Sequence, residues 1–390
     1  MTEVRRLAAE DSAAFYALAR YAFHKPQSET RDRAFAGLYE HSAAWAIGSP
    51  LQSGLLGTHF TVDLSGVTYG MSGVGYVSSY PEASGHGGIS AIMAEAFADM
   101  RAAGETLSYL APFSSTFYRR FGYEGAFDQV THTIAARDLP RVPRASAAVS
   151  VARVPFRAAI AAMAEVYGRS KAATRGGLRR ADWWWLNMAD HYPDREVAVA
   201  MLGDRPTGYV IYERDGETFR VHEEFHDDLD ALLALGKFIT AHRTAFATFV
   251  YTTGDPESLH DLLPDPAALT TSVRAYMMAR IVDLEDFMTR YPYQVSDLAP
   301  VVFAVEDEFI PANAGLWQLA INDGQASFTR ADAHAVPGLR LTIQQLVKVT
   351  FGVRALRDAY NLGLVDGDPF TIASVGDAFL AHQTQLYDYF

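Results

Sequence analysis

The apolar positions in the first part of the chain alternate between two periods, one typical of helices and one typical of strands. An amphipathic segment near the start places Phe15, Leu18 and Ala22 on one face of a predicted helix. Extended apolar runs follow at residues 43–47, 55–64 and 67–80, with glycine and serine between them. Such runs predict strands joined by short turns, here a meander that leads into one long strand.

A second helix is predicted after the long strand and its glycine-containing loop. Its apolar residues recur at spacings of three and four, and they are Ile89, Ile92, Met93, Ala96, Phe97 and Met100. Gly104 is placed to end this helix, and residues 106–111 predict a further buried strand. Strand, loop, helix and strand together form a crossover unit, which occurs in partly parallel sheets.

The same order of elements recurs later in the chain. Residues 138–150, DLPRVPRASAAVS, are rich in proline, arginine and small residues, as boundaries between domains tend to be. The elements predicted beyond them are strands near Tyr209 and at residues 218–222, a helix at residues 229–242 and a strand at residues 247–252. This segment therefore resembles a second copy of the first domain.

A third region has a different order. The run at residues 271–288 leads into strands near residues 301–305, 316–321 and 326–329, followed by helices, the last of them from about Val375 towards the chain end. The fold class predicted is α/β (α+β). We predict domains at residues 1–137, 149–285 and 286–390.

Composition narrows the possible functions. The 390 residues are 49% hydrophobic and 20% charged, which is typical of a folded globular protein. No apolar run approaches the roughly 20 residues of a membrane helix, and the start lacks a signal peptide, so a cytoplasmic location is expected. A formal charge of −13 disfavours nucleic acid and anionic membranes as partners and suits a cationic substrate, although many proteins are acidic for solubility alone.

The loop SGHGGIS at residues 84–90 is a candidate phosphate site. Between a strand and a helix, glycines let backbone N–H groups point outward, and the helix dipole adds partial positive charge. The same glycines could also form a structural turn. A dinucleotide fingerprint and a Walker loop are both absent.

The segment FSSTFYRRFGYE, at residues 113–124, directly follows the next strand. It predicts a short helix carrying Phe117 and Tyr118 and then a turn at Gly122. The order of long strand, P-E-x-x-G-x-G-G loop, helix, strand and F-Y-R-R-F-G-Y resembles the core of the GNAT acetyltransferases. With the run MARIVDLEDF and an aromatic C-terminus, the three-part chain is similar to the enhanced intracellular survival (Eis) family. That resemblance implies tandem GNAT domains, the second degenerate, followed by a sterol-carrier-like domain.

The resemblance also implies roles for particular residues, with acetyl-CoA as cosubstrate. Tyr118 matches the general acid, and Phe390 supplies a terminal carboxylate as general base. The implied CoA-binding residues are Val77, Ser78, Ser79, Gly85, His86, Gly87, Gly88, Ile89, Ser90, Phe113 and Ser114. The sequence departs from the family at Ser84 and Ile89, and it has no Lys or Arg between Thr58 and Met100. Either CoA then binds more weakly, or arginines from elsewhere, such as Arg119 or Arg120, meet the charge of its phosphates.

This chemistry has a physical basis. An alkylamine, with a pKa of about 10, is protonated at neutral pH, so a carboxylate that attracts it and takes its proton promotes attack on the thioester. A C-terminal carboxylate has a pKa of only about 3.5 unless burial raises it. A phenol suits protonation of the leaving thiolate, although Tyr118 could instead only pack against the sheet. With no cysteine in the chain, direct attack is favoured over a thiol-linked intermediate.

Two further patterns have structural explanations. Trp183, Trp184 and Trp185 could line an amine pocket, but they also fit a helix that packs against its neighbours. His222 and His226 match H-E-x-x-H, a zinc-binding spacing on a helix, yet here the run closes a predicted strand. We therefore expect no metal site.

Three functions remain open. The resemblance favours a small-molecule acceptor such as a polyamine or an aminoglycoside-like amine. The acceptor could instead be a protein lysine or N-terminus, or the chain could bind CoA or lipid without turnover. The family resemblance also implies a homo-oligomer, a trimer or hexamer.

Overall fold

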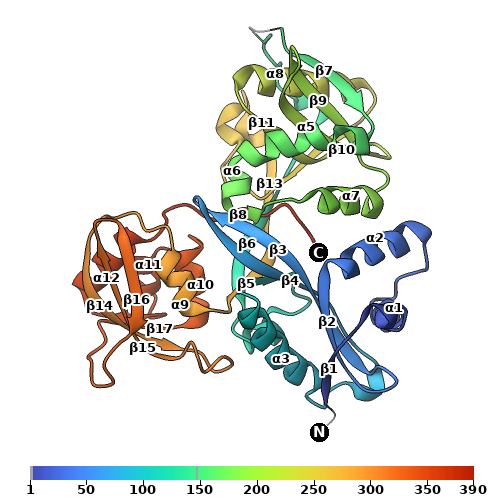
Figure 1. Ribbon diagram of the computed structural model, residues 1–390. Helices are drawn as coiled ribbons and strands as arrows, with labels where there is room; N and C mark the ends of the chain where they lie inside the picture. Colours follow the sequence, from blue (N-terminus) through green and yellow to red (C-terminus); the bar gives the residue numbers. More distant parts are fainter. Residues whose placement is uncertain (1–2, 146–147) are drawn as a thin grey trace. The chain divides into compact units, whose positions relative to one another are not determined.

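The computed structural model describes residues 3–145 and 148–390, and the contacts of the chain divide it into two compact units (Figure 1). The first unit contains the residues up to Phe127 together with Tyr276–Thr384 and Asp388–Phe390. The second contains Asp128–Ala275 and Gln385–Tyr387. Of the described helices, none has the length and apolar character that crossing a membrane requires.

The first unit begins with a mixed sheet flanked by helices. Its N-terminal elements are β1 (Val4–Arg6), α1 (Ser12–Phe23), α2 (Glu29–Glu40), β2 (Ser42–Ile47), β3 (Ser53–Leu64), β4 (Val67–Ser79), α3 (Gly88–Ala102), β5 (Glu105–Leu110), α4 (Ser115–Arg119) and the start of β6 (Glu124–Ala135). The strand order is β1, β2, β3, β4, β5 and then the end of β13 (Thr270–Ile281). The predicted meander, long strand, helix and buried strand are thereby confirmed.

The strand–helix–strand crossover of the first unit is built as the sequence pattern predicts. β4 and β5 pair in parallel from Gly70 to Val74, and α3 connects them. The apolar face of α3 is buried through Ile92, Met93, Ala96, Phe97 and Met100. Burial of such a stripe, at roughly 25 cal/mol per Å² of apolar surface, is the main force that holds α3 on the sheet.

The second unit contains its own strand–helix–strand crossover. Its elements are β7 (Ser150–Val154), α5 (Phe156–Arg169), α6 (Lys171–Thr174), β8 (Arg175–Leu178), α7 (Asp182–His191), β9 (Glu196–Leu202), β10 (Arg205–Asp215), β11 (Thr218–His226), α8 (Leu229–Thr240), β12 (Thr248–Thr253) and parts of β6 and β13. β11 and β12 pair in parallel, and α8 connects them. The recurrence of the first domain's element order is thereby confirmed.

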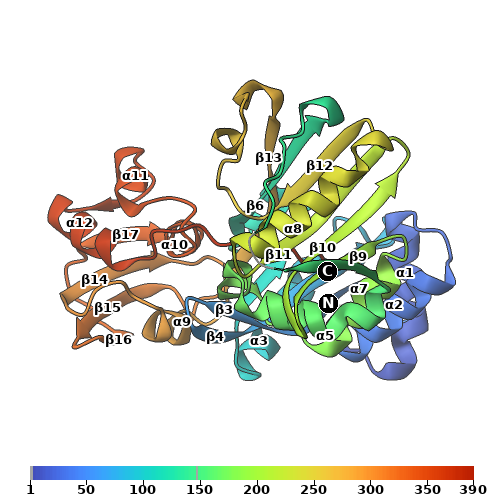
Figure 2. The ribbon, with the colours of Figure 1, turned by 90° about the horizontal axis from the view of Figure 1, so that it is seen from above.

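The C-terminal part of the first unit forms a separate five-stranded sheet. Its elements are α9 (Leu284–Arg290), β14 (Leu298–Glu306), β15 (Gly315–Asn322), β16 (Gln325–Arg330), β17 (Leu339–Thr342), α10 (Ile343–Thr350), α11 (Leu356–Asn361), β18 (Asp366–Gly367) and α12 (Pro369–Ala378). The strand order is β16, β15, β14, β17, β18, and Figure 2 shows α10, α11 and α12 on one side of this sheet.

The expectation that the last helix continues towards the chain end is wrong. α12 stops at Ala378, and residues 379–390 form no helix. The backbone groups here find distant partners instead: Gln294 donates to the carbonyl of Ala378, and the N–H of Leu380 donates to the hydroxyl of Tyr291. These long-range hydrogen bonds replace the local ones that a helix would supply.

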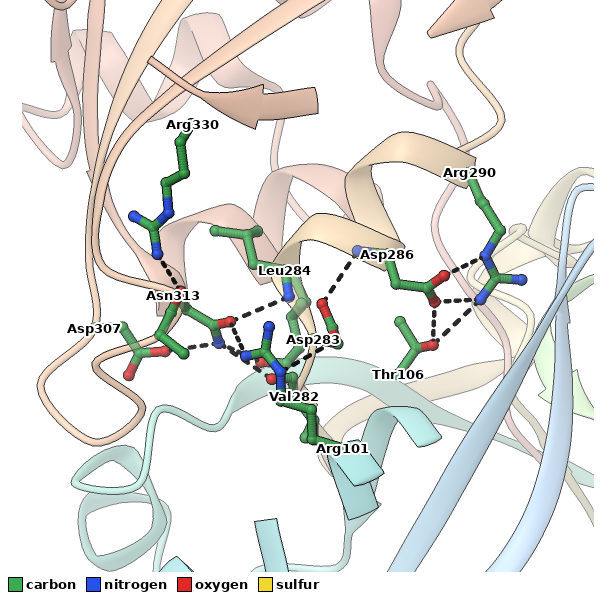
Figure 3. A network of polar contacts seen from close by, with 12 residues as sticks. Arg101, Thr106, Val282, Asp283, Leu284, Asp286, Arg290, Asp307, Asn313 and Arg330 are labelled. Atoms are coloured by element: carbon green, nitrogen blue, oxygen red, sulfur yellow. Dashed lines mark hydrogen bonds and ion pairs between the residues drawn. The ribbon is translucent and has the colours of Figure 1, made fainter. Parts of the chain in front are cut away.

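Asn313 is the centre of a polar network within the first unit (Figure 3). The Asn313 side chain is fully buried and accepts hydrogen bonds from Arg101 of α3 and from the N–H of Leu284. Its amide nitrogen donates to the carbonyl of Val282 and to Asp307. Because Asn313, Asp307 and Leu284 are buried, the contacts fix the loop after β14 against α3 and the end of β13.

Candidate functional site

The end of β4 departs from regular pairing where the CoA arm is expected. β3 and β4 shift register between the pairs Gly54–Ser78 and Leu56–Gly75. Within this irregularity Tyr76 has a φ of 53°, a left-handed value that is rare for a bulky residue. β4 also runs on beyond Val74, the last residue that pairs with β5. Val77, Ser78 and Ser79 thus lie on a stretch of strand that β5 does not cover.

The loop between β4 and α3 leaves a helix N-terminus without a side-chain cap. Gly85 and Gly87 have φ values of 81° and 79°, which only glycine adopts readily. Gly87 is the N-cap of α3, and no side chain bonds to the first N–H groups of this helix. A Cβ on either glycine would meet no atom within 4 Å. His86 is exposed, and Gly88, Ile89 and Ser90 are half-buried. The geometry leaves N–H donors and open space for an anion.

Tyr118 is buried inside an aromatic cluster. The hydroxyl of Ser114 caps α4 by accepting from the N–H of Phe117, at 3.3 Å. The Tyr118 ring lies 5.1 Å from the ring of Phe117 and 5.4 Å from that of Phe113, which is 69% exposed. Burial raises the pKa of Tyr118 well above its ordinary value, and Tyr389 adds to the shift. The phenol is protonated at neutral pH, as an ordinary phenol is, and its burial makes it a weaker acid.

The last residues of the sequence contact the same strand, β4. The ring of Phe390 lies 5.1 Å from that of Phe60 on β3. A Cβ on Gly75 would be 3.4 Å from the main-chain carbonyl carbon of Phe390 and 3.5 Å from its oxygen. The hydroxyl of Tyr276 holds this segment by donating to the carbonyl of Asp388, at 2.9 Å. The main-chain carbonyl group of Phe390 thus lies beside the irregular part of β4.

The two arginines suggested as phosphate ligands have other partners. Arg119 makes two hydrogen bonds to Glu124, of 2.9 and 2.8 Å. The guanidinium of Arg120 lies 4.6 Å from the centre of the Phe117 ring and donates to the Phe117 carbonyl. Both contacts hold the arginine side chains at α4.

Sequence reasoning did not single out Gly73, Gly75 or Glu124 as residues of this region. The two glycines allow Phe390 to approach the backbone of β4 closely, and a Cβ on Gly73 would meet its ring. Their signal in the sequence is the unusual density of glycine within a strand, which often marks a close approach. Glu124 binds Arg119 and carries no comparable signal in the sequence.

The second unit builds the corresponding helix start differently. Asp228 caps α8 by accepting from the N–H of Ala231, at 2.9 Å. The neighbouring Asp227 pairs with Arg169 and with Arg205. A carboxylate therefore already occupies the position that a phosphate would need at this helix N-terminus.

The H-E-x-x-H run lies entirely in β11. Strand geometry places residues four apart on one face but about 13 Å from each other, too far to share a metal ion. His222 contacts Glu213 and His226 contacts Glu224. Across residues 3–145 and 148–390, no group of three or more His, Cys, Asp or Glu side chains is arranged to hold a metal.

The tryptophans of α7 pack into the second unit. Trp184 is 3% exposed and Trp185 is fully buried. The Trp185 ring lies 5.9 Å from that of Tyr167. These two rings therefore serve the core of the unit, in agreement with the structural explanation of the run.

Comparison with known families identifies the three parts. Residues 3–126 and residues 176–281 each match an acetyltransferase (GNAT) domain, and residues 284–387 match a sterol carrier protein domain. The chain is 32% identical to a conserved protein of unknown function from Enterococcus faecalis, a probable N-acyltransferase. The similarity covers 100% of both chains with a TM-score of 0.95.

Two further proteins resemble the chain. An uncharacterized N-acetyltransferase of Streptomyces avermitilis is 29% identical over 293 residues, or 67% of each chain. The crystal structure of Eis1 from Mycobacterium abscessus has the same fold, with 20% identity, 100% coverage of both chains and a TM-score of 0.82. The predicted fold class, tandem GNAT domains followed by a sterol-carrier-like domain, is confirmed. The chain belongs to the GNAT acetyltransferases, and it is an acyltransferase enzyme with two GNAT domains and a sterol carrier domain.

Proposed function

We propose that this enzyme transfers an acetyl group from acetyl-CoA to the amine of a small cationic acceptor by direct attack. The observation that carries the proposal is the position of the Phe390 carboxyl group beside Gly75, on the strand whose end passes into the glycine loop. A carboxylate there is placed to attract an ammonium group and to take its proton.

The proposed CoA site follows the backbone from β4 to α4. Val77, Ser78 and Ser79 would border the acetyl group and the pantetheine arm, with Phe113 and Ser114 also along the arm. The loop residues Gly85, His86, Gly87, Gly88, Ile89 and Ser90 would hold the pyrophosphate through backbone N–H groups. The uncapped N-terminus of α3 supports this assignment, because its unpaired donors and dipole favour an anion.

The proposed reaction needs two proton transfers. The amine nitrogen loses its proton to the Phe390 carboxylate, directly or through water, and forms a bond to the thioester carbonyl carbon. When the tetrahedral intermediate collapses, the carbon–sulfur bond breaks, and Tyr118 donates its phenolic proton to the departing thiolate. An ordinary phenol, with a pKa of about 10, enters the reaction protonated at neutral pH, as this step requires.

The formal charge of −13 favours a cationic acceptor, such as a polyamine or an aminoglycoside-like amine. The family resemblance further supports a homo-oligomer, a trimer or hexamer, and we propose a cytoplasmic location. A thiol-release assay with acetyl-CoA against a panel of polyamines, aminoglycosides and lysine-containing peptides tests the acceptor. Turnover with the small amines alone is expected. Turnover with peptides alone would move the acceptor to protein, and CoA binding without any turnover would favour a binding protein.

A further inference from the structure

We propose that the sterol carrier domain, together with Arg280, holds the turn that carries Tyr118, so that it positions the general acid of the first GNAT domain. This inference rests on the proposed role of Tyr118 as the proton donor. The turn comprises residues 118–124, and its own hydrogen bonds run from the N–H of Phe121 to the carbonyl of Tyr118 and from the N–H of Gly122 to that of Arg119. The N–H of Tyr123 also donates to the carbonyl of Tyr118, and Arg119 pairs with Glu124. All of these bonds lie within the turn, so they do not tie it to the rest of the protein.

The first contact is a buried ion pair under Gly122. Arg280 is fully buried and donates to Asp307 over 2.5 Å. A Cβ on Gly122 would lie 2.5 Å from the Cζ of Arg280, so the guanidinium lies directly against the backbone of the turn. Gly122 also has a φ of 82°, which excludes most other residues. The turn is therefore seated on a side chain whose position is fixed by the sterol carrier domain.

The second contact is made by the ring of Phe309, an aromatic wedge on the loop that carries Asp307. The other oxygen of Asp307 accepts from the N–H groups of Phe309 and Ile310, at 3.1 and 3.0 Å. These bonds aim Phe309 at the first GNAT domain, where its ring meets Phe121 edge-on at 4.9 Å and Phe97 of α3 at 5.8 Å. One carboxylate thus orients both the guanidinium and the ring that bracket the turn.

The third contact comes from α10. Gln344 donates to the carbonyl of Arg119 over 3.0 Å, at the end of α4. Lys348 lies 3.7 Å from Glu124, the residue that also binds Arg119. Gln344 and Lys348, one helical turn apart, therefore contact the two ends of the segment from Arg119 to Glu124.

On its other side, the turn is fixed to the catalytic sheet. The hydroxyl of Tyr123 is hydrogen-bonded to Ser108 of β5 at 2.7 Å, and Ser108 donates to the carbonyl of Ser72 on β4. The ring of Tyr123 also lies 6.1 Å from that of Tyr118. A shift of the turn away from the sterol carrier side would therefore move Tyr118 relative to β4 and β5.

The test is a double-mutant cycle in the full-length enzyme. Phe309→Ala removes the wedge, Tyr118→Phe removes the acid, and both are combined. Phe309→Ala is expected to lower kcat about tenfold or more while KM for acetyl-CoA changes by less than about twofold, because misplacement of a catalytic group affects the chemical step. In the Tyr118→Phe background it is expected to have no further effect, because residues that act as one unit are not additive. Phe370→Ala is the matched control, since Phe370 is 81% exposed on the same domain.

Gln344→Ala provides a milder variant, which removes one hydrogen bond at α4 and keeps the packing. It is expected to reduce kcat in the same direction, again only when Tyr118 is present, and it decides the matter if Phe309→Ala does not fold. Losses that add fully to that of Tyr118→Phe, or unchanged kcat in both folded variants, would overturn the positioning role alone. If Tyr118→Phe itself retains full turnover, the proposed acid fails, and the inference fails with it.

Discussion

Gly73 and Phe390 are packed so tightly that a Cβ atom on Gly73 would lie 2.6 Å from the Cδ2 atom of the Phe390 ring. No such atom fits without displacing the ring, since real contacts of this kind are longer. The ring also meets Phe60, so it packs against residues of both β3 and β4. The position of the Phe390 carboxyl group therefore depends on the absence of a side chain at residue 73.

Gly73→Ala should displace the Phe390 ring and lower turnover by about tenfold, or roughly 1.4 kcal/mol of barrier. CoA binding, measured by calorimetry, should change little, because the glycine loop is not altered. Gly168→Ala is a suitable control: Gly168 is exposed in α5, and a Cβ there meets no atom within 4 Å. It should keep full activity and gain up to about 1 kcal/mol of stability.

Extension of the chain by a few residues beyond Phe390 should also reduce turnover, by at least about tenfold. The extension keeps every native side chain but replaces the carboxylate at Gly75 by a neutral amide. Melting temperature and CoA affinity should stay close to those of the unextended protein. A C-terminally tagged enzyme with full thiol-release activity would remove the carboxylate from the mechanism.

Tyr118→Phe should lower kcat by about 10²- to 10⁴-fold, the range typical of general acids. The ring and its packing against Phe113 and Phe117 are retained, so CoA affinity should hardly change. Steady-state kinetics together with CoA titration separate the two effects. Equal losses in kcat and in CoA affinity would instead indicate that the hydroxyl matters for the architecture of the site.

The loop should respond to backbone conformation more than to charge. Gly87→Val places a β-branched residue at a φ of 79° and at the uncapped start of α3, so CoA binding should weaken strongly. His86→Ala leaves the backbone free to adopt the same conformation and should change CoA affinity little. Calorimetric titration of both variants checks this, and the opposite ranking would contradict the proposed loop assignment.

Calorimetry of the intact protein should give one CoA per chain. The second GNAT domain has Asp228 where a phosphate would bind at the start of α8, and a carboxylate repels a pyrophosphate. Replacement by Ser, Asp228→Ser, keeps a cap and removes the charge. Two equal sites in the unaltered enzyme would disagree with this account of the second domain.

Much of the fold could be predicted because its signals are local. The spacing of apolar residues in α3, the glycines before it and the acidic cap of α8 each act within a few residues of the element that they define. The reliance on local signals also explains the main error, which was to continue the last helix beyond Ala378. The residues after Ala378 have helix-compatible composition, but Leu380 donates to Tyr291, 89 positions earlier in the chain. The spacing of apolar residues carries no information about a hydrogen-bond partner so far away in the sequence.

The candidate site has local and long-range parts in the same way. The loop at Gly85–Gly87 and the segment around Tyr118 have recognisable sequence patterns. The binding of Arg119 by Glu124, and the contacts of Phe390 with Gly73 and Gly75, depend on how strands and chain end meet in three dimensions. Arg119 was therefore suggested as a phosphate ligand, although its guanidinium is held by a carboxylate.

The hydrogen bond from Gln344 to the Arg119 carbonyl has a consequence for folding kinetics, because the two residues are 225 positions apart. Contacts of such long range form slowly, since the entropy of closing the loop must be overcome before the contact contributes. Strands β1 to β5 of the first GNAT domain are near neighbours in sequence and can pair before the catalytic turn is fixed, whereas the pairing of β5 with β13 is also of long range. In refolding from denaturant, far-ultraviolet circular dichroism should recover first, and acetyl transfer should return only after a lag.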